Sequence, residues 1–273
     1  WRTSSSTFPI RPDVRPLVIT MGDPAGIGPE IVLRAVRERP ALLRDVLVAG
    51  DVASLQRALH LTASRRDSAT DALMLAEVGA ADEVAGLPPG CLAVLQACDP
   101  LPPVLFGQID AAAGRAAADC IRWGARAVLT GQGRGLVTAP IHKEALAAAG
   151  VDHPGHTEML QALAAEHLGT RVADLPVRMM LGAPGLATVL VSIHVSLRQA
   201  IEAVTHANVL ETLRITAAHW ARLGLAPPRI AVAGLNPHAG EGGLFGREEI
   251  EVIAPAVAQA RAEGIEASGP HAP

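Results

Sequence analysis

Aromatic residues are almost missing from this chain of 273 residues: they make up 2% of it, and tyrosine is absent. A core must therefore be built from Ala, Val, Leu and Ile, which suits helices packed on a buried parallel sheet. No uninterrupted apolar stretch is long enough to span a bilayer. The polar residues 1–6 lack the apolar segment of a signal peptide. These absences favour a globular protein without a membrane partner.

Cysteine and clustered positive charge are also scarce. Cys91, Cys98 and Cys120 are the only cysteines, and none forms a Cys-x-x-Cys pair, so a zinc knuckle and a redox motif are excluded. Free thiols are typical of cytosolic proteins, and we expect a cytoplasmic location. The formal net charge is −4 and no run of Lys or Arg occurs, which argues against a nucleic-acid partner.

Short β-branched runs alternate with longer helical patterns along the chain, which predicts an α/β fold with a mostly parallel sheet. Two apolar runs around a Gly-Ala-Pro-Gly turn predict an antiparallel hairpin. We expect strands at 17–20, 46–49, 135–138 and 229–235, the hairpin at 177–181 and 187–193, and helices at 29–36, 53–59, 111–127, 143–149, 158–167, 206–223 and 247–262.

A glycine-rich loop, GDPAGIGPE at residues 22–30, joins the first predicted strand to its helix. Free N–H groups at the start of that helix could face an anion. A tight turn without a ligand explains the residues equally well, and the spacing is not that of a dinucleotide fingerprint. A second glycine cluster, at residues 131–135, precedes a strand, and we interpret it as a flexible connection.

Polar residues follow the strand predicted at 135–138. Thr138, His142 and Lys143 lie at its carboxyl end, where ligands collect in open α/β sheets. His156 and Thr157 come soon after, in the segment HPGHTE. The alternatives are that Lys143 is a solvated residue of a first helical turn and that Thr157 is only a helix cap.

Two histidines follow apolar strands in the second half of the chain. His194 ends the run 187–193, and His238 follows the run 229–235. Two such strands side by side would direct both imidazoles, the commonest metal-binding side chains, toward one cation. Two unrelated histidines are the alternative. Five glycines between Gly234 and Gly246 favour a ligand or a partner subunit close to the backbone.

Together and in this order, GDPAGIGPE, VTAPIHK (137–143), PGHTE (154–158), His194 and LNPHAGEGG (235–243) resemble the 4-hydroxythreonine-4-phosphate dehydrogenase family. The resemblance runs from about residue 16 to the end. It implies a three-layer α/β/α fold like that of isocitrate and isopropylmalate dehydrogenases. It also implies one catalytic domain of two lobes over residues 16–273, behind a flexible segment at 1–15, and a homodimer with active sites near the subunit interface.

The resemblance further implies NAD-dependent oxidation and decarboxylation of 4-hydroxythreonine 4-phosphate to 3-amino-2-oxopropyl phosphate, in pyridoxal phosphate biosynthesis. The cofactors would be NAD, with NADP as a variant, and a divalent metal such as Zn, Mg or Co. His156 and Thr157 would contact the substrate, with Lys143 as a further catalytic residue. His194 and His238 would be two of three metal-binding histidines.

The third metal-binding histidine of the family lies in a later His-Asp-Gln-Gly segment, which is not found up to Pro273. We therefore expect a C-terminally truncated chain that lacks much of the NAD site. Three alternatives stay open: a dehydrogenase of threonate or erythronate 4-phosphate, a dehydrogenase of aromatic cis-dihydrodiols, and a phosphate or acyl transferase or binding protein on a similar scaffold.

Overall fold

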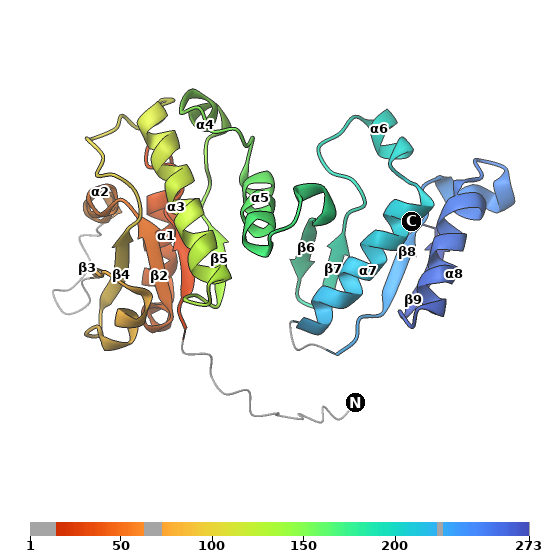
Figure 1. Ribbon diagram of the computed structural model, residues 1–273, viewed down its shortest axis with the longest axis horizontal. Coiled ribbons are helices and arrows are strands. Elements are labelled where there is room, and N and C mark those ends of the chain that lie inside the picture. The colour runs from red at the N-terminus through yellow and green to blue at the C-terminus, as the bar shows by residue number, and fades with distance from the viewer. Residues whose placement is uncertain (1–14, 63–72, 223–225, 273) are drawn as a thin grey trace. The chain divides into compact units, whose positions relative to one another are not determined.

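The computed structural model describes residues 15–62, 73–222 and 226–272. The contacts within the chain divide it into two compact units, Trp1–Leu175 and Pro176–Pro273 (Figure 1). All but the last residue of the segment predicted to be flexible at 1–15 lies outside the described residues. None of the described helices combines the length and apolar composition needed to cross a bilayer.

The first unit is built on a parallel sheet of five strands in the order β3-β4-β2-β1-β5. The α/β fold with a mostly parallel sheet is thereby confirmed. The strands are β1 (Leu17–Thr20), β2 (Val46–Gly50), β3 (Met74–Glu77), β4 (Cys91–Gln96) and β5 (Gly135–Thr138). Strands β3 and β4 were not predicted, because short apolar runs without clear alternation do not distinguish a strand from other buried segments.

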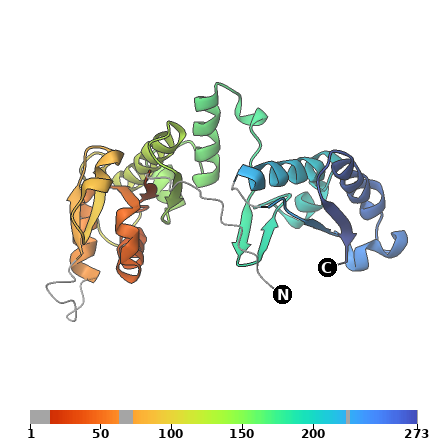
Figure 2. The same cartoon turned by 90° about the horizontal axis from the view of Figure 1, so that it is seen from below.

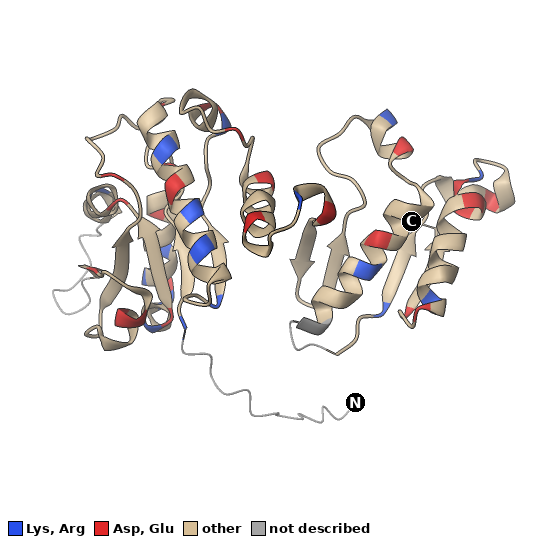
Figure 3. Ribbon diagram, in the orientation of Figure 1, with Lys and Arg blue, Asp and Glu red and all other residues tan. Residues whose placement is uncertain are grey.

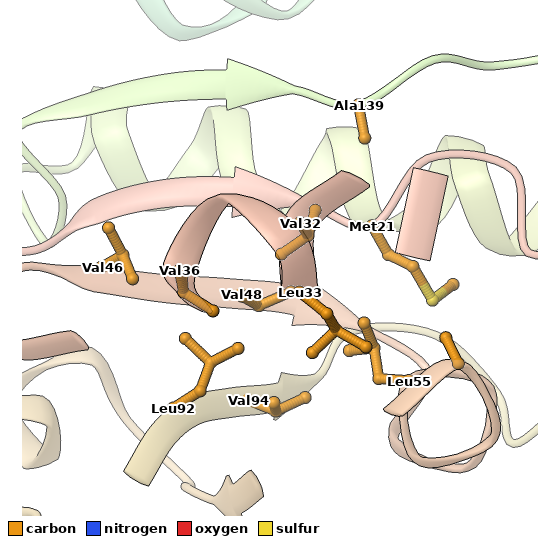
Figure 4. Close-up of a cluster of buried hydrophobic side chains, with 11 residues drawn as sticks. Met21, Val32, Leu33, Val36, Val46, Val48, Leu55, Leu92, Val94 and Ala139 are labelled. Carbon is orange, nitrogen blue, oxygen red and sulfur yellow. The ribbon is translucent and has the colours of Figure 1, made fainter. Parts of the chain in front are cut away.

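Helices cover both faces of this sheet. The connection β1–α1–β2 runs in one direction along the sheet and β4–α3–β5 runs in the other, so right-handed crossovers put α1 and α3 on opposite faces. Leu33 and Val36 of α1 pack with Val48 and Leu92 on one face (Figure 4). The helices are α1 (Gly28–Glu38), η1 (Pro40–Arg44), α2 (Val52–Thr62), η2 (Ala81–Gly86), α3 (Ala111–Leu129), α4 (Lys143–Ala148), α5 (His156–Leu168) and η3 (Val172–Asp174).

The second unit contains two small sheets. The predicted hairpin is confirmed as the antiparallel pair β6 (Met180–Ala183) and β7 (Leu186–Val189). Strands β8 (Ile230–Ala233) and β9 (Ala267–His271) form a parallel pair, of which β9 was not predicted. The remaining elements are α6 (Leu197–Glu202), α7 (His206–Arg222), η4 (Pro237–Gly243), η5 (Glu249–Ile253) and α8 (Ala254–Ala262).

The core of the second unit lies between α7 and α8, which run side by side (Figure 1, Figure 2). Val209 and Leu213 of α7 pack against Val257 and Ala260 of α8, and β8 and β9 cover this cluster with Ile230 and Ala267. The single helix predicted at 247–262 is wrong at its start, because η5 is a π-helical turn. Charged residues of both signs are interspersed over each unit (Figure 3).

The loop after β1 is joined to the loop after β5. The Asp23 N–H donates to the Pro140 carbonyl at 2.9 Å, and the Asp23 carboxylate accepts from the Ala25 N–H at 2.9 Å. Gly22 has a φ of +77°, and a Cβ placed there would lie 2.4 Å from the Pro140 oxygen. Strands β1 and β5 are parallel, but the crossover that leaves β1 and the crossover that enters β5 run in opposite directions along the sheet. The joined loops therefore border the position where ligands bind in open α/β sheets.

We predict that Gly22→Ala destabilises the first unit more than Gly90→Ala does. Both glycines have positive φ, at +77° and +85°, but a Cβ at Gly90 meets no atom within 4 Å. Gly90→Ala should therefore cost only the backbone strain, about 1 kcal/mol, and Gly22→Ala a further ~1–3 kcal/mol from overpacking. Urea unfolding measures both, and equal losses would contradict the close approach at Pro140.

Candidate functional site

Helix α5 starts at the carboxyl edge of the first sheet with two of the predicted site residues. Its N-cap is Gly155, whose backbone is extended and which offers no side chain to cap the helix, so His156 and Thr157 occupy the first two helical positions. The alternative of Thr157 as the cap is therefore wrong, because the helix begins one residue before it. Thr157 is exposed and His156 is half-buried.

The imidazole of His156 lies against the loop that follows β5. Burial lowers the pKa of His156, and a smaller opposing effect comes from a hydrogen bond to the backbone of Ala139. Its Nε2 atom is buried and has no hydrogen-bond partner among the described residues. A buried polar atom without a partner is costly, which makes Nε2 the natural contact for a bound ligand. The ring is neutral at neutral pH, so its tautomer decides whether Nε2 donates or accepts.

Lys143 reaches the same place from α4. It is the first residue of that helix and exposed, and a Cβ placed on Gly155 would lie 3.9 Å from its Cε. Thr138 is the last residue of β5 and pairs in register with Thr20 of β1. His142 is the N-cap of α4, without a side-chain capping bond. The structure thus brings Lys143 and the start of α5 together at the end of β5, as the sequence predicted.

His194 and His238 belong to the second unit, and both are exposed. Each comes five residues after the last residue of its strand, Val189 of β7 or Ala233 of β8. The strands belong to different sheets. The expectation of two histidines on adjacent strand tips is therefore wrong, because loops and not strand ends carry both rings.

The two histidines share an unusual backbone conformation. His194 has a φ of 54° and His238 a φ of 56°, in the left-handed region that residues with a side chain seldom adopt. Such conformations persist only where the surrounding structure enforces them, and they cluster at ligand sites. This similarity supports a common role for His194 and His238, although the adjacent-strand geometry is wrong.

His238 begins a left-handed turn of five consecutive residues that ends at Gly242. Three of them carry side chains, and each of these costs about 1–2 kcal/mol in that conformation. The turn begins where Glu249, which is 3% exposed, accepts hydrogen bonds from the Leu235 and Asn236 N–H groups at 2.7 Å. Burial raises the pKa of Glu249, but the bonds from Asn236 and Leu235 outweigh it, and the pKa is lowered.

Glu249 and Asn236 are structural residues of this loop that the sequence reasoning missed. A usable signal was the pair of adjacent acidic residues, Glu248 and Glu249, directly after the glycine cluster and at the start of a predicted helix. Such a pair can supply a buried carboxylate that accepts from the backbone N–H groups of the preceding loop.

The donor chemistry of the second unit fits part of a metal site. Imidazole nitrogen is a good ligand for zinc and cobalt, and two such donors leave two positions of a tetrahedral ion for other groups. Within the described ranges, no group of three histidine, cysteine or carboxylate side chains is placed to hold a metal ion. His194 and His238 are two nitrogen donors on different loops of this unit, and a complete site needs at least one more.

We predict that His156 makes stability depend on pH. Its folded-state pKa is lowered, so its contribution is fully present above the ordinary value of about 6.5 and is lost as the pH falls through the lowered value. Between about pH 7.5 and about pH 5.5, the urea midpoint of the wild type should fall more than that of His156→Asn. His60→Asn, on the exposed face of α2, is the control and should follow the wild type. Equal losses in wild type and His156→Asn would contradict the burial effect.

Comparison with known proteins shows which family the chain resembles. Residues 42–273 match the family model of the pyridoxal phosphate biosynthetic protein PdxA. A 4-hydroxythreonine-4-phosphate dehydrogenase of Beijerinckia indica is 44% identical over 255 residues, which cover 93% of this chain and 71% of the relative. A D-threonate 4-phosphate dehydrogenase of Salmonella typhimurium is 37% identical, covering 96% and 76%.

A solved structure shares the fold as well. The crystal structure of 4-hydroxythreonine-4-phosphate dehydrogenase from Klebsiella pneumoniae superimposes with a TM-score of 0.80 at 36% identity, and the match covers 95% of this chain and 74% of that one. The family model, the relatives and the solved structure therefore indicate one family. The chain belongs to the family of the pyridoxal phosphate biosynthetic protein PdxA.

Proposed function

We propose that this chain is an oxidoreductase that converts 4-hydroxythreonine 4-phosphate to 3-amino-2-oxopropyl phosphate, with NAD as hydride acceptor and loss of carbon dioxide. The reaction would serve pyridoxal phosphate biosynthesis. Membership in the PdxA family supports the proposal. The observation that carries it is the approach of Lys143 to Gly155, the N-cap of the helix that begins with His156 and Thr157, at the sheet edge where a small ligand is expected.

In the first unit, the proposed substrate contacts are His156 and Thr157, with Lys143 as a third catalytic residue. Nε2 of neutral His156 would accept a hydrogen bond from a substrate hydroxyl, because the other ring nitrogen holds the proton that bonds to the Ala139 backbone. The Thr157 hydroxyl can donate or accept one more bond, and the ammonium of Lys143 would attract a phosphate or carboxylate. The free N–H groups at the start of α5 favour a negative group at the same place.

In the second unit, His194 and His238 would hold a divalent cation such as zinc, magnesium or cobalt. When bound, such a cation would polarise the substrate oxygen while the nicotinamide of NAD or NADP accepts the hydride. The chain's own contribution would be two imidazole nitrogen donors, each carried by a residue with left-handed backbone. Each ring must lose any proton at the ligating nitrogen before it binds.

A second candidate substrate is a four-carbon sugar-acid phosphate. The Salmonella typhimurium relative named D-threonate 4-phosphate dehydrogenase is nearly as similar to this chain as the relatives named for 4-hydroxythreonine 4-phosphate. The two substrates differ where a hydroxyl replaces an amine. A protein contact to that group would therefore select one substrate over the other. The second candidate substrate for this chain is threonate or erythronate 4-phosphate.

Our proposal includes a homodimer in the cytoplasm. Cys91, Cys98 and Cys120 are all free thiols in the structure, which is typical of a reducing compartment. The size of the protein in solution tests the dimer, and fractionation of cells tests the location. One domain of two lobes over residues 16–273 is part of the same proposal, and the two compact units are its natural lobes.

We predict that the protein forms NADH from NAD and 4-hydroxythreonine 4-phosphate, at a higher kcat/KM than with D-threonate 4-phosphate. The absorbance of NADH measures both rates. His156→Ala should lower kcat/KM by roughly 100-fold, because it removes the group that contacts the reacting oxygen. His60→Ala, on the exposed face of α2, is the matched control. A higher kcat/KM with D-threonate 4-phosphate establishes the second candidate, and NADH formation with neither substrate refutes the dehydrogenase.

We also predict that His194→Ala and His238→Ala each weaken cobalt(II) binding by at least about 10-fold, since each removes one nitrogen donor. The control is His219→Ala, an exposed histidine of α7 whose ring bonds to the Ile215 carbonyl. Equilibrium dialysis or calorimetry gives the affinities, and a chelator should abolish turnover. Full metal stoichiometry in both variants would rule out the ligand assignment.

A further inference from the structure

The loop that carries His238 is closed by one buried carboxylate. Oxygen Oε1 of Glu249 accepts from the backbone N–H groups of Leu235 and Asn236, both at 2.7 Å. Oxygen Oε2 accepts from the side-chain amide of Asn236 at 2.9 Å. Leu235 and Asn236 are the residues at which the chain leaves β8 and turns toward His238. Glu249 therefore determines the direction in which the loop begins.

The same carboxylate also touches the middle of the turn. A Cβ placed on Gly240 would lie 2.9 Å from Oε2 of Glu249, and one placed on Gly234 would lie 3.2 Å from Oε1. The backbone thus packs closely on Glu249 both before and after His238. A side chain at Gly240 would collide with the carboxylate, and one at Gly234 would be crowded by Ala239 and the carboxylate, which explains two of the glycines of this segment.

Glu249 is the first residue of the π-helical turn η5, which places its carboxylate against the loop. The turn spans Glu249–Ile253, directly before α8, and such turns often occur at functional sites. It presents Glu248 and Glu249 to the same partner: the Asn236 amide also donates to Oε2 of Glu248 at 2.7 Å. Glu248 is less buried than Glu249, and its backbone hydrogen bonds are to its own residue and Arg247. Of the two carboxylates, it is Glu249 that bonds to the loop backbone at Leu235 and Asn236.

We propose that Glu249 is a positioning residue for His238: its buried carboxylate holds the left-handed turn that directs the imidazole toward the cation. The proposal rests on the ligand role of His238 in the proposed function. The turn needs such support because His238, Ala239 and Glu241 all have positive φ. Without the carboxylate, these three residues gain by returning to ordinary conformations, and the imidazole changes direction.

The contact of His238 with Phe245 connects the imidazole ring to the part of the loop that packs on Glu249. The two ring centroids are 6.2 Å apart and the planes are tilted by 44°. The Phe245 N–H donates to the Gly240 carbonyl at 3.2 Å, and Gly240 packs on Glu249. A shift of the carboxylate is thus transmitted through Gly240 and Phe245 to the imidazole, as well as through the backbone at Asn236.

The test is Glu249→Gln in the full chain, with Glu251→Gln as matched control. The glutamine oxygen can keep both backbone bonds, but its NH₂ group then faces the donor NH₂ of Asn236. Glu251 lies in the same π-helical turn, and its carboxylate pairs with the exposed Arg247. The readouts are cobalt(II) affinity, the visible spectrum of bound cobalt, and hydrogen exchange of the Leu235 and Asn236 amides in the metal-free protein.

We expect Glu249→Gln to bind cobalt(II) roughly 10-fold more weakly, as other residues that orient a metal ligand do. We also expect a changed cobalt spectrum and faster amide exchange, with the Glu251→Gln variant like the wild type. If His238→Ala weakens cobalt(II) binding but Glu249→Gln has the spectrum and the affinity of the wild type, the positioning role alone is overturned. Unchanged affinity in His238→Ala overturns the ligand role and this proposal together.

A second variant keeps the test decisive if Glu249→Gln does not fold, as judged by circular dichroism. Asn236→Ala removes one of the three bonds to Glu249 and leaves the two backbone bonds in place. In a folded protein, weaker cobalt(II) binding by Asn236→Ala supports the positioning role. Affinity equal to the wild type overturns it.

Discussion

The hydrogen bond from the Asp23 N–H to the Pro140 carbonyl is the constraint on which the first unit's site depends. It joins the loops that follow β1 and β5, which are neighbours in the sheet but far apart in sequence. Gly22 permits this approach because a side chain there would meet the Pro140 oxygen. His156 bonds to the backbone of Ala139 in the same loop, and its burial lowers its pKa.

In the second unit, the main constraint is the support of the loop that carries His238. There the loop must hold a histidine in a backbone conformation that side chains resist, and a buried carboxylate with three hydrogen bonds enforces it. A buried charge is tolerated only when its hydrogen bonds are satisfied, so Glu249 and the loop depend on each other. The groups proposed to bind a ligand stand at helix starts in the first unit and on loops in the second unit.

Much of the framework was predictable because its signals are local. The runs at β1, β2 and β5, the hairpin β6–β7 and the helices α3 and α7 follow from apolar periodicity and turn residues near each element. Lys143 was predicted to line a site because ligands collect at the carboxyl ends of parallel strands, whereas His156 was assigned to the substrate only through the family resemblance. Strands β3, β4 and β9 were missed, because their short runs become strands only through pairing with neighbours distant in sequence.

The sequence alone determined the α/β fold class, the resemblance to a phosphorylated hydroxy-acid dehydrogenase and the residues expected to act, since these depend on periodicity and on motifs contained in short segments. Tertiary structure alone decided that Thr157 lies inside α5, that His194 and His238 sit on left-handed loops and not on neighbouring strand tips, and that Glu249 supports one of them. The physical reason is that burial, unpaired atoms and enforced backbone strain arise only when segments far apart in the chain are packed together.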